Sequence, residues 1–262
     1  MNNVNKTLYI PLYGKSYVSR KGIILSDKKA EEIWENECFE LKGKSKSKWL
    51  AYYMGMRSAV FDIWLRKKIK ANPRAAVLHI GCGMDSRIER VGTECEKWYD
   101  IDFPDVIDER RKYYKETDVY RMIKADVRNE GWLNPVPSGN DAIVILEGVS
   151  MYFRLDELKR LLRDLSNHFS SVRILMDCYT VKAAKASKYK NPINDVGVTA
   201  VYGIDDPSIL ENETGMHFVV EHNMTPKAMI NQLEGFEKKF FSALFGGKIS
   251  RMMYRMYEFK SV

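Results

Sequence analysis

The sequence predicts an α/β protein with a mostly parallel sheet, an antiparallel hairpin at its C-terminal end and a helical N-terminal extension. From residue 75 onward, short apolar runs alternate with amphipathic helical patterns, which is typical of βαβ units. Residues 1–74 instead show apolar side chains at helical spacing. Beyond residue 215, two strand patterns flank one helix and leave no room for a parallel crossover on each side. These two strands are therefore expected to pair antiparallel.

In the N-terminal extension we expect two helices after a short irregular start. Segment 8–14 contains a proline and a glycine, which predicts a loop or an edge segment. Ser26 and Asp27 supply an N-cap ahead of acidic first turns, which predicts a helix over 27–39. Apolar residues at helical spacing and a basic last turn predict a longer helix over 49–70.

Five apolar runs predict the parallel strands of the sheet. They span residues 76–80, 95–101, 120–127, 142–146 and 172–178. The fourth run is the most uniformly apolar, as expected for a central strand. Helical patterns follow the second and the fourth run, over residues 104–114 and 155–169.

The C-terminal part is expected to close the sheet. Strand patterns at 216–222 and 251–262 flank a helix predicted over 225–245. Residues 181–212 give no clear pattern. The sequence has no repeat at a fixed period of 20–50 residues, which excludes a solenoid or a propeller.

The composition excludes several classes of protein. Hydrophobic residues make up 45% and charged residues 29% of the chain, which excludes collagen-like and disordered proteins. The four cysteines lack a CxxC pair and the four histidines lie far apart, so reduced thiols and no metal site are expected. The apolar runs are far shorter than the ~20 residues that cross a bilayer, and the N-terminus lacks a signal-peptide pattern. We therefore expect a cytoplasmic protein without a membrane partner.

The positive charge is concentrated in the N-terminal part of the chain. The formal net charge is +7, but residues 1–75 hold 16 Lys and Arg against 7 Asp and Glu, and the remaining residues hold 26 against 28. The densest tract, KGKSKSK over Lys42–Lys48, is expected to be a solvated, mobile loop. Attraction of an anionic substrate or of a phosphate backbone is the alternative.

A glycine-rich turn follows the first predicted strand, in VLHIGCGMDSR. Gly81 and Gly83 would let the backbone approach a ligand at the carboxyl end of the sheet, where open α/β sheets bind nucleotides. The dinucleotide fingerprint needs a third glycine where this chain has Ser86, so a tight pyrophosphate contact is not expected. About 20 residues further on, Asp100 and Asp102 are placed to accept hydrogen bonds from ribose hydroxyls. This combination fits a nucleoside without a pyrophosphate.

Acidic residues also end the next two predicted strands. Asp126 ends the third strand, and Glu147 precedes Gly148 at the end of the fourth. Carboxylates gathered in one crevice need donors or a cation, and an adenine amino group, ribose hydroxyls, an ammonium or a sulfonium would suit them. Two of these acids also have a structural interpretation, Asp102 as an acid at a helix N-terminus and Asp126 as a cap before Arg128.

The ordered set of motifs resembles a known family. Six segments between Thr7 and Asp177 carry the resemblance: TLYIPLYGKSYVSRKGIILSDKKAEEI, AYYMGMRSAVFD, VLHIGCGMDSR, WYDIDFPDVIDERR, ADVRNEGWL and ILEGVSMYF. They are similar to the tetracenomycin-type polyketide O-methyltransferases, within the leucine carboxyl methyltransferase superfamily. The resemblance implies the Rossmann-like class I methyltransferase fold and S-adenosylmethionine as the cofactor.

The resemblance also implies residues for the methionine end of the cofactor. Arg57 would bind the methionine carboxylate, Gly81 would line the cofactor, and Glu147 would face the amino group. Because Arg57 must reach the cofactor, residues 1–74 would cap the active site of a single integrated domain whose core is 75–262.

For the nucleoside end, the resemblance implies Asp102 as the ribose ligand and Asp126 with Val127 beside the adenine. Two departures from the usual patterns occur. Many methyltransferases have an acid where this chain has His79, which we expect to be a buried core imidazole. The family usually has arginine where this chain has Lys15, so no substrate role is assigned to Lys15.

The predicted reaction is methyl transfer to the carboxylate of a small organic acid or polyketide-like acceptor. A carboxylic acid has a reference pKa near ~4, so the acceptor is ionised at neutral pH and needs no base. Basic N-terminal residues would steer the acid, and Tyr152 would help to shape the acceptor pocket. A phenol or other hydroxyl acceptor is the alternative. A phenol, with a reference pKa near ~10, would need a base, for which His217 and His222 are the first candidates.

Two other classes of protein rank lower. The basic charge suggests nucleic-acid binding, but the lysine tract lacks interleaved aromatic residues, and no finger, RNP or helix-turn-helix signature occurs. An NAD-dependent oxidoreductase is disfavoured by Ser86 and by the lack of a Tyr/Lys or His pair in a clear catalytic setting.

Overall fold

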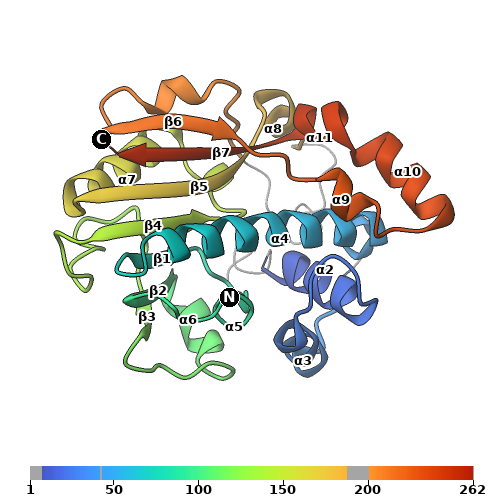
Figure 1. The fold of residues 1–262 in the computed structure, drawn as a ribbon, viewed down its shortest axis with the longest axis horizontal. Coiled ribbons are helices and arrows are strands. Elements are labelled where there is room, and N and C mark those ends of the chain that lie inside the picture. Colours follow the sequence, from blue (N-terminus) through green and yellow to red (C-terminus); the bar gives the residue numbers. More distant parts are fainter. Residues whose placement is uncertain (1–7, 42, 188–200, 262) are drawn as a thin grey trace.

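A seven-stranded sheet forms the centre of the computed structural model, which describes residues 8–41, 43–187 and 201–261 (Figure 1). Its strand order is β3-β2-β1-β4-β5-β7-β6. The strands are β1 (Ala76–Ile80), β2 (Lys97–Asp102), β3 (Tyr120–Lys124), β4 (Asp141–Leu146), β5 (Ser171–Tyr179), β6 (Met216–Glu221) and β7 (Tyr254–Ser261). Strands β1 to β5 run parallel, whereas β7 pairs antiparallel with both β5 and β6. The predicted fold class is confirmed, and the uniformly apolar β4 is the central strand.

Helices cover both faces of this sheet. The α-helices are α2 (Tyr9–Arg20), α3 (Lys28–Glu37), α4 (Lys48–Ala71), α5 (Arg87–Val91), α6 (Pro104–Arg110), α7 (Leu155–His168), α8 (Val181–Ser187), α9 (Lys227–Ile230), α10 (Gly235–Phe245) and α11 (Gly247–Met253). The described residues also form three short 3-10 helices, η1 (Gly43–Lys46), η2 (Ser150–Tyr152) and η4 (Pro207–Leu210). Four predicted helices are thereby confirmed, with shifted ends, as α3, α4, α6 and α7.

The alternation of side chains along the strands divides the core in two. Val77 and Ile143 belong to the buried cluster that contains α2, α3 and α4, whereas Leu78 and Val144 pack with the leucines of α7. Successive side chains of a strand point to opposite faces, so each parallel strand can be apolar throughout. Figure 1 shows the long α4 crossing one face of the sheet and α7 on the other.

The prediction of a loop or an edge segment over 8–14 is wrong, because these residues begin α2. Pro11 lies in the first turn, where its missing N–H has no intrahelical acceptor to lose. Gly14 faces α4 so closely that a Cβ there would lie 2.7 Å from the Cβ of Met54. The glycine therefore permits tight helix packing rather than a turn.

The C-terminal helix predicted over 225–245 is divided into α9 and α10, and a further helix, α11, follows it. Gly235 and Gly247 have φ angles of +49° and +54°, which favour glycine and separate the helices. Helix α11 takes up residues 251–253, so the last strand begins at Tyr254. Of the unclear segment 181–212, α8 and η4 are described, and 188–200 lies outside the described residues.

No helix among the described residues has both the length and the apolar character that crossing a membrane requires.

Candidate active site

A cavity of about 610 Å³ lies at the carboxyl ends of β1, β2 and β4. Its walls come from α2, α4, α8, α10 and α11 as well as from the strand ends. The volume falls within the range of roughly 300–1,000 Å³ that is usual for small-molecule sites. Among the residues predicted from the sequence, six line the cavity: Arg57, Gly81, Gly83, Asp102, Glu147 and Tyr152.

The glycine turn brings the backbone against the cavity. Gly81 has a φ of +65°, and a Cβ there would lie 2.3 Å from Cγ2 of Val149. Any larger residue would therefore collide with the loop after β4. Gly83 also has a positive φ, and its N–H donates to Oδ2 of Asp102 at 2.7 Å. This bond ties the turn after β1 to the end of β2.

The two aspartates of β2 have different environments. Asp100 is fully buried and accepts hydrogen bonds from Arg110, from Tyr120 at 2.6 Å and from Trp98 at 2.8 Å. Burial disfavours its charge, but Arg110 and the other donors lower its pKa to about 2. Asp100 therefore holds the core together, and Asp102 is the aspartate of β2 that lines the cavity.

The carboxylate of Asp102 is less strongly stabilised. It accepts backbone N–H groups from Gly83 at 2.7 Å and from Phe103 at 2.8 Å. Desolvation nevertheless raises the pKa of Asp102 to about 6. Each oxygen accepts one of these bonds and can accept another from a ligand.

Arg57 connects two carboxylates at neighbouring strand ends. Its Nε donates to Oε1 of Glu147 and its Nη1 donates to Oδ2 of Asp177, both at 3.1 Å. Oδ1 of Asp177 in turn accepts the N–H of Gly148 at 2.6 Å. Burial opposes the charge on Arg57, but the two carboxylates raise its pKa. The structure thus joins two residues that the sequence predicts, Arg57 and Glu147, through direct contact.

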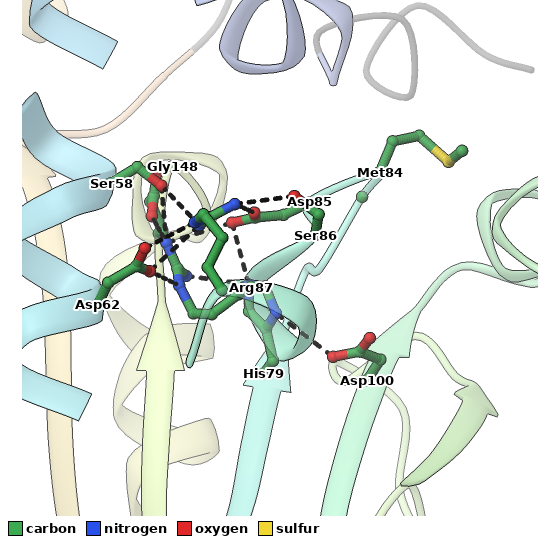
Figure 2. A network of polar contacts seen from close by, with 12 residues as sticks. Ser58, Asp62, His79, Met84, Asp85, Ser86, Arg87, Asp100 and Gly148 are labelled. Atoms are coloured by element: carbon green, nitrogen blue, oxygen red, sulfur yellow. Dashed lines mark hydrogen bonds and ion pairs between the residues drawn. The ribbon is translucent and has the colours of Figure 1, made fainter. Parts of the chain in front are cut away.

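Arg87 is the centre of a wider buried network (Figure 2). Its Nε donates to Asp62 at 2.8 Å, and its Nη2 donates to Ser58 at 3.0 Å and lies 3.2 Å from Asp85. It also forms an ion pair with Glu147. Glu147 therefore has an arginine on each oxygen, and these two cations lower its pKa although burial opposes its charge.

Sequence reasoning does not select Arg87 or Asp177 as site residues, although a signal exists for each. Arg87 directly follows the GCGMDS turn, and Asp177 lies near the end of the fifth predicted strand. The rule that selects Glu147, that carboxyl ends of parallel strands face one crevice, applies equally to Asp177.

Two predicted adenine ligands do not line the cavity. The carboxylate of Asp126 accepts hydrogen bonds from Arg128, from Nη2 at 2.6 Å and from Nε at 2.8 Å. Val127 is buried in the core on the α7 side of the sheet. Oδ1 of Asp126 also accepts the backbone N–H of Arg128 at 3.0 Å, which matches the alternative interpretation of Asp126 as a cap before Arg128. A role beside the adenine stays a prediction for both residues.

The histidines have structural partners. His79 is buried, as expected, with Nδ1 at 3.3 Å from Asp100 and Nε2 at 3.3 Å from Arg87. Burial lowers the pKa of His79. His217 and His222 are not among the residues that line the cavity, and His222 contacts a glutamate on β7 at 2.8 Å.

The N-terminal lysines have two kinds of environment. Lys15 is buried with its Nζ at 3.3 Å from Asp85, and burial lowers its pKa. Part of the tract that was expected to be a loop forms η1, whose exposed Lys44 lines the cavity. Lys48 forms an ion pair with Glu237 of α10 at 2.8 Å, whereas Lys42 lies outside the described residues. The tract therefore touches the site through Lys44, and its last lysine joins the start of α4 to α10.

The strand order, the glycine turn and the acids at the strand ends define the class I methyltransferase fold. The magnesium protoporphyrin IX methyltransferase ChlM of Synechocystis PCC 6803 has this fold, with a TM-score of 0.54, 12% identity and coverage of 95% of this chain and 97% of that one. An S-adenosylmethionine-dependent methyltransferase of Mesorhizobium loti superposes with a TM-score of 0.55 at 11% identity, over 76% of this chain and 97% of that one.

The sequence defines the family more narrowly. Residues 7–166 match the family described as leucine carboxyl methyltransferase, and the chain belongs to this family. It is 29% identical to the tetracenomycin polyketide synthesis O-methyltransferase TcmP of Streptomyces glaucescens, over 91% of this chain and 89% of that one. It is 30% identical to the S-adenosyl-L-methionine-dependent methyltransferase dpfgK of Gibberella zeae, over 64% of this chain and 61% of that one. The protein is an S-adenosylmethionine-dependent O-methyltransferase.

Proposed function

We propose that this O-methyltransferase holds its cofactor with Arg57 and Glu147 at the methionine end and Asp102 at the ribose. The fit rests on unused hydrogen-bonding capacity that faces the cavity. Among the described residues, the hydrogen bonds of Arg57 use Nε and Nη1, and Nη2 has no acceptor. Nη2 lies beside Gly148, where a Cβ would be only 3.4 Å away. A guanidinium with a free edge suits a carboxylate ligand.

The N-terminal segment is, in this proposal, part of the active site. Arg57 lies in the middle of α4, and its contacts with Glu147 and Asp177 cross from the N-terminal helices to the sheet. The core cluster on this face contains residues of α2 and α4 together with residues of β1 and β4. Residues 1–74 and 75–262 therefore form one functional unit.

We propose a carboxylate oxygen of a small, largely apolar molecule as the methyl acceptor. The cavity opposite the strand ends is lined by apolar and aromatic side chains, including Met151, Tyr152, Tyr179, Phe245 and Tyr254. The name of TcmP connects that relative with polyketide synthesis, which fits an acceptor of this character. The bound cofactor supplies an electrophilic methyl group, and the protein would align the acceptor oxygen with it.

The environment of His79 is the observation that favours a carboxylate over a phenol. His79 is the one histidine among the described residues that line the cavity, and its two nitrogens face Asp100 and Arg87 rather than the acceptor region. A phenol would need a base, whereas a carboxylate is already ionised near neutral pH.

The acceptor chemistry can be tested with paired substrates at saturating S-adenosylmethionine. We expect aromatic carboxylic acids to give base-labile methyl esters, at a rate that stays flat from pH 6 to 9. Matched phenols are expected to react at least tenfold more slowly. An alkali-stable ether as the main product, together with a rate that a histidine substitution abolishes, would contradict the proposal.

The raised pKa of Asp102 predicts a pH dependence of cofactor binding. With a pKa of about 6, Asp102 is a carboxylate at pH 7.5 and mostly protonated at pH 5. Because protonation removes an acceptor for a ribose hydroxyl, affinity for S-adenosylhomocysteine should fall about tenfold between these values. Calorimetry at both pH values measures the change. Asp102→Asn should bind weakly and lose this dependence, and an unchanged pH profile in that variant would contradict the assignment.

A further inference from the structure

Helices α10 and α11 expose an unusual amount of apolar surface. Phe236 is 71% exposed, and four further large apolar side chains are between 39% and 55% exposed: Leu244, Ile249, Met252 and Met253. Exposed apolar patches mark interaction sites in soluble proteins. Figure 1 shows α10 at the periphery of the fold, away from the sheet.

Three apolar residues of α10 form a stripe, in which Phe236 and Leu244 are exposed and Phe240 is half-buried. Phe236, Phe240 and Leu244 follow one another at four-residue spacing, which places them on one side of the helix. The ring of Phe240 lies 5.5 Å from Phe236 and 4.4 Å from Trp49. Phe241, on the other side, is fully buried. Phe241 and the contact of Phe240 with Trp49 therefore anchor the helix, and Phe236 and Leu244 remain exposed for a partner.

The sequence around this stripe is rich in positive charge. Residues 227–253 contain five Lys and Arg against two Glu, although Arg251 forms an ion pair with Glu221 at 2.6 Å. Lys44 and Lys46 of η1 are also exposed. Glu237 is occupied by Lys48 at 2.8 Å and by Lys21 at 3.2 Å. Within the described part of the chain, the exposed Lys238 and Lys239 have no ion-pair partner.

The same surface continues into the cavity. Leu244, Ile249 and Met253 line it, as does Lys44 of η1. An apolar ligand that leaves a hydrophobic environment at this surface would thus enter the cavity beside apolar side chains.

We propose that α10, α11 and η1 form a docking surface for an anionic lipid bilayer, against which the mouth of the cavity opens, although the sequence alone predicts no membrane partner. Interfacial helices that combine Phe and Leu with lysines bind at the headgroup boundary through apolar burial and attraction to anionic lipids. A second copy of this chain fits less well, because a two-fold interface would bring the same cationic surface against itself. A nucleic acid would match the charge but not the exposed Phe236 and Met252.

Vesicle sedimentation tests the surface without any methyl acceptor. The full chain should bind phosphatidylcholine vesicles that contain 30% phosphatidylglycerol at least tenfold more strongly than pure phosphatidylcholine vesicles. Raising the salt concentration should weaken this binding, because exposed charges are screened. Absence of binding to the anionic vesicles at low salt would overturn the proposal.

Two double variants separate the apolar and the charged contributions. Phe236→Ser with Met252→Ser, and Lys238→Glu with Lys239→Glu, should each reduce vesicle binding at least tenfold. Neither pair lines the cavity, so affinity for S-adenosylhomocysteine should not change. Lys67→Glu with Lys70→Glu, exposed on the far part of α4, is the charge-matched control and should keep vesicle binding.

Three outcomes count against the lipid surface. Equal loss of binding in the control pair would assign the effect to net charge. A dimer of the full chain in light scattering that Phe236→Ser with Met252→Ser abolishes would show that a second copy covers the stripe. If a short duplex DNA displaces the protein from vesicles, and Phe236→Ser with Met252→Ser does not change vesicle binding, the surface binds nucleic acid instead. The acceptor assays above are independent of all three outcomes.

Discussion

Arg87→Met is expected to lower the free energy of unfolding by about 3–5 kcal/mol, the usual cost of removing one partner from a buried ion pair. Arg87 has no exposed surface and contacts the carboxylates of Asp62, Asp85 and Glu147. Methionine approximates the length of the side chain but leaves these carboxylates with less positive charge. Urea unfolding at pH 8 measures the effect. Arg128→Met is the matched control, because the pair of Arg128 with Asp126 is partly exposed and should contribute under ~1 kcal/mol.

The same variant should show a defined pH dependence. Without Arg87, the native pKa values of the neighbouring carboxylates rise toward or above their unfolded values near ~4. The native variant then binds more protons than the native wild type, so the stability difference from wild type should shrink as the pH falls from 8 to 5.5. If the free energies of unfolding of variant and wild type differ by less than ~1 kcal/mol at every pH, the ion pairs of Arg87 do not stabilise the protein.

The strands could be predicted from the sequence because their signal is local. The run 76–80 coincides with β1, and 142–146 differs from β4 by one residue. Both runs are continuous in the sequence, and Gly81 follows the first and Glu147 the second. A parallel strand that is buried on both faces needs apolar side chains at successive positions. It therefore produces a continuous apolar run wherever it lies in the sheet.

Segment 8–14 could not be predicted because its conformation depends on another helix. Pro11 and Gly14 are local signals for a turn. In the structure, Pro11 instead lies in the first turn of α2, and Gly14 allows the close approach of α4, so tertiary packing overrides the local signals. The starts of α10 and α11 do have local signals, Gly235 and Gly247. A prediction that uses apolar spacing alone does not detect them.

The candidate site also combines residues that have a local sequence signal with contacts that depend on distant parts of the chain. Asp102 and Glu147 lie in the cavity because strand ends of a parallel sheet converge. Asp126 follows the end of β3, yet Arg128, two residues away, binds its carboxylate. The pairing of Arg57 with Asp177 joins residues 120 positions apart and has no counterpart in local sequence.

Arg57→Ala is expected to weaken cofactor binding ten- to a hundredfold. A charge-assisted hydrogen-bonded pair contributes ~1.5 to 3 kcal/mol, which corresponds to that range of affinity. Arg57→Lys should recover little, because one ammonium cannot contact Glu147 and Asp177 and still offer a planar edge to a carboxylate.

Calorimetry with S-adenosylhomocysteine measures the loss, at a temperature where thermal unfolding shows each variant to be folded. Arg66→Ala is the control, because Arg66 is exposed on the same helix and does not line the cavity. It should bind as the wild type does. Removing Arg57 also leaves Asp177 without its cation, so the pKa of Asp177, already raised by burial, should rise further. If folded Arg57→Ala keeps wild-type affinity, the contact of α4 with the sheet is structural and the N-terminal segment does not hold the cofactor.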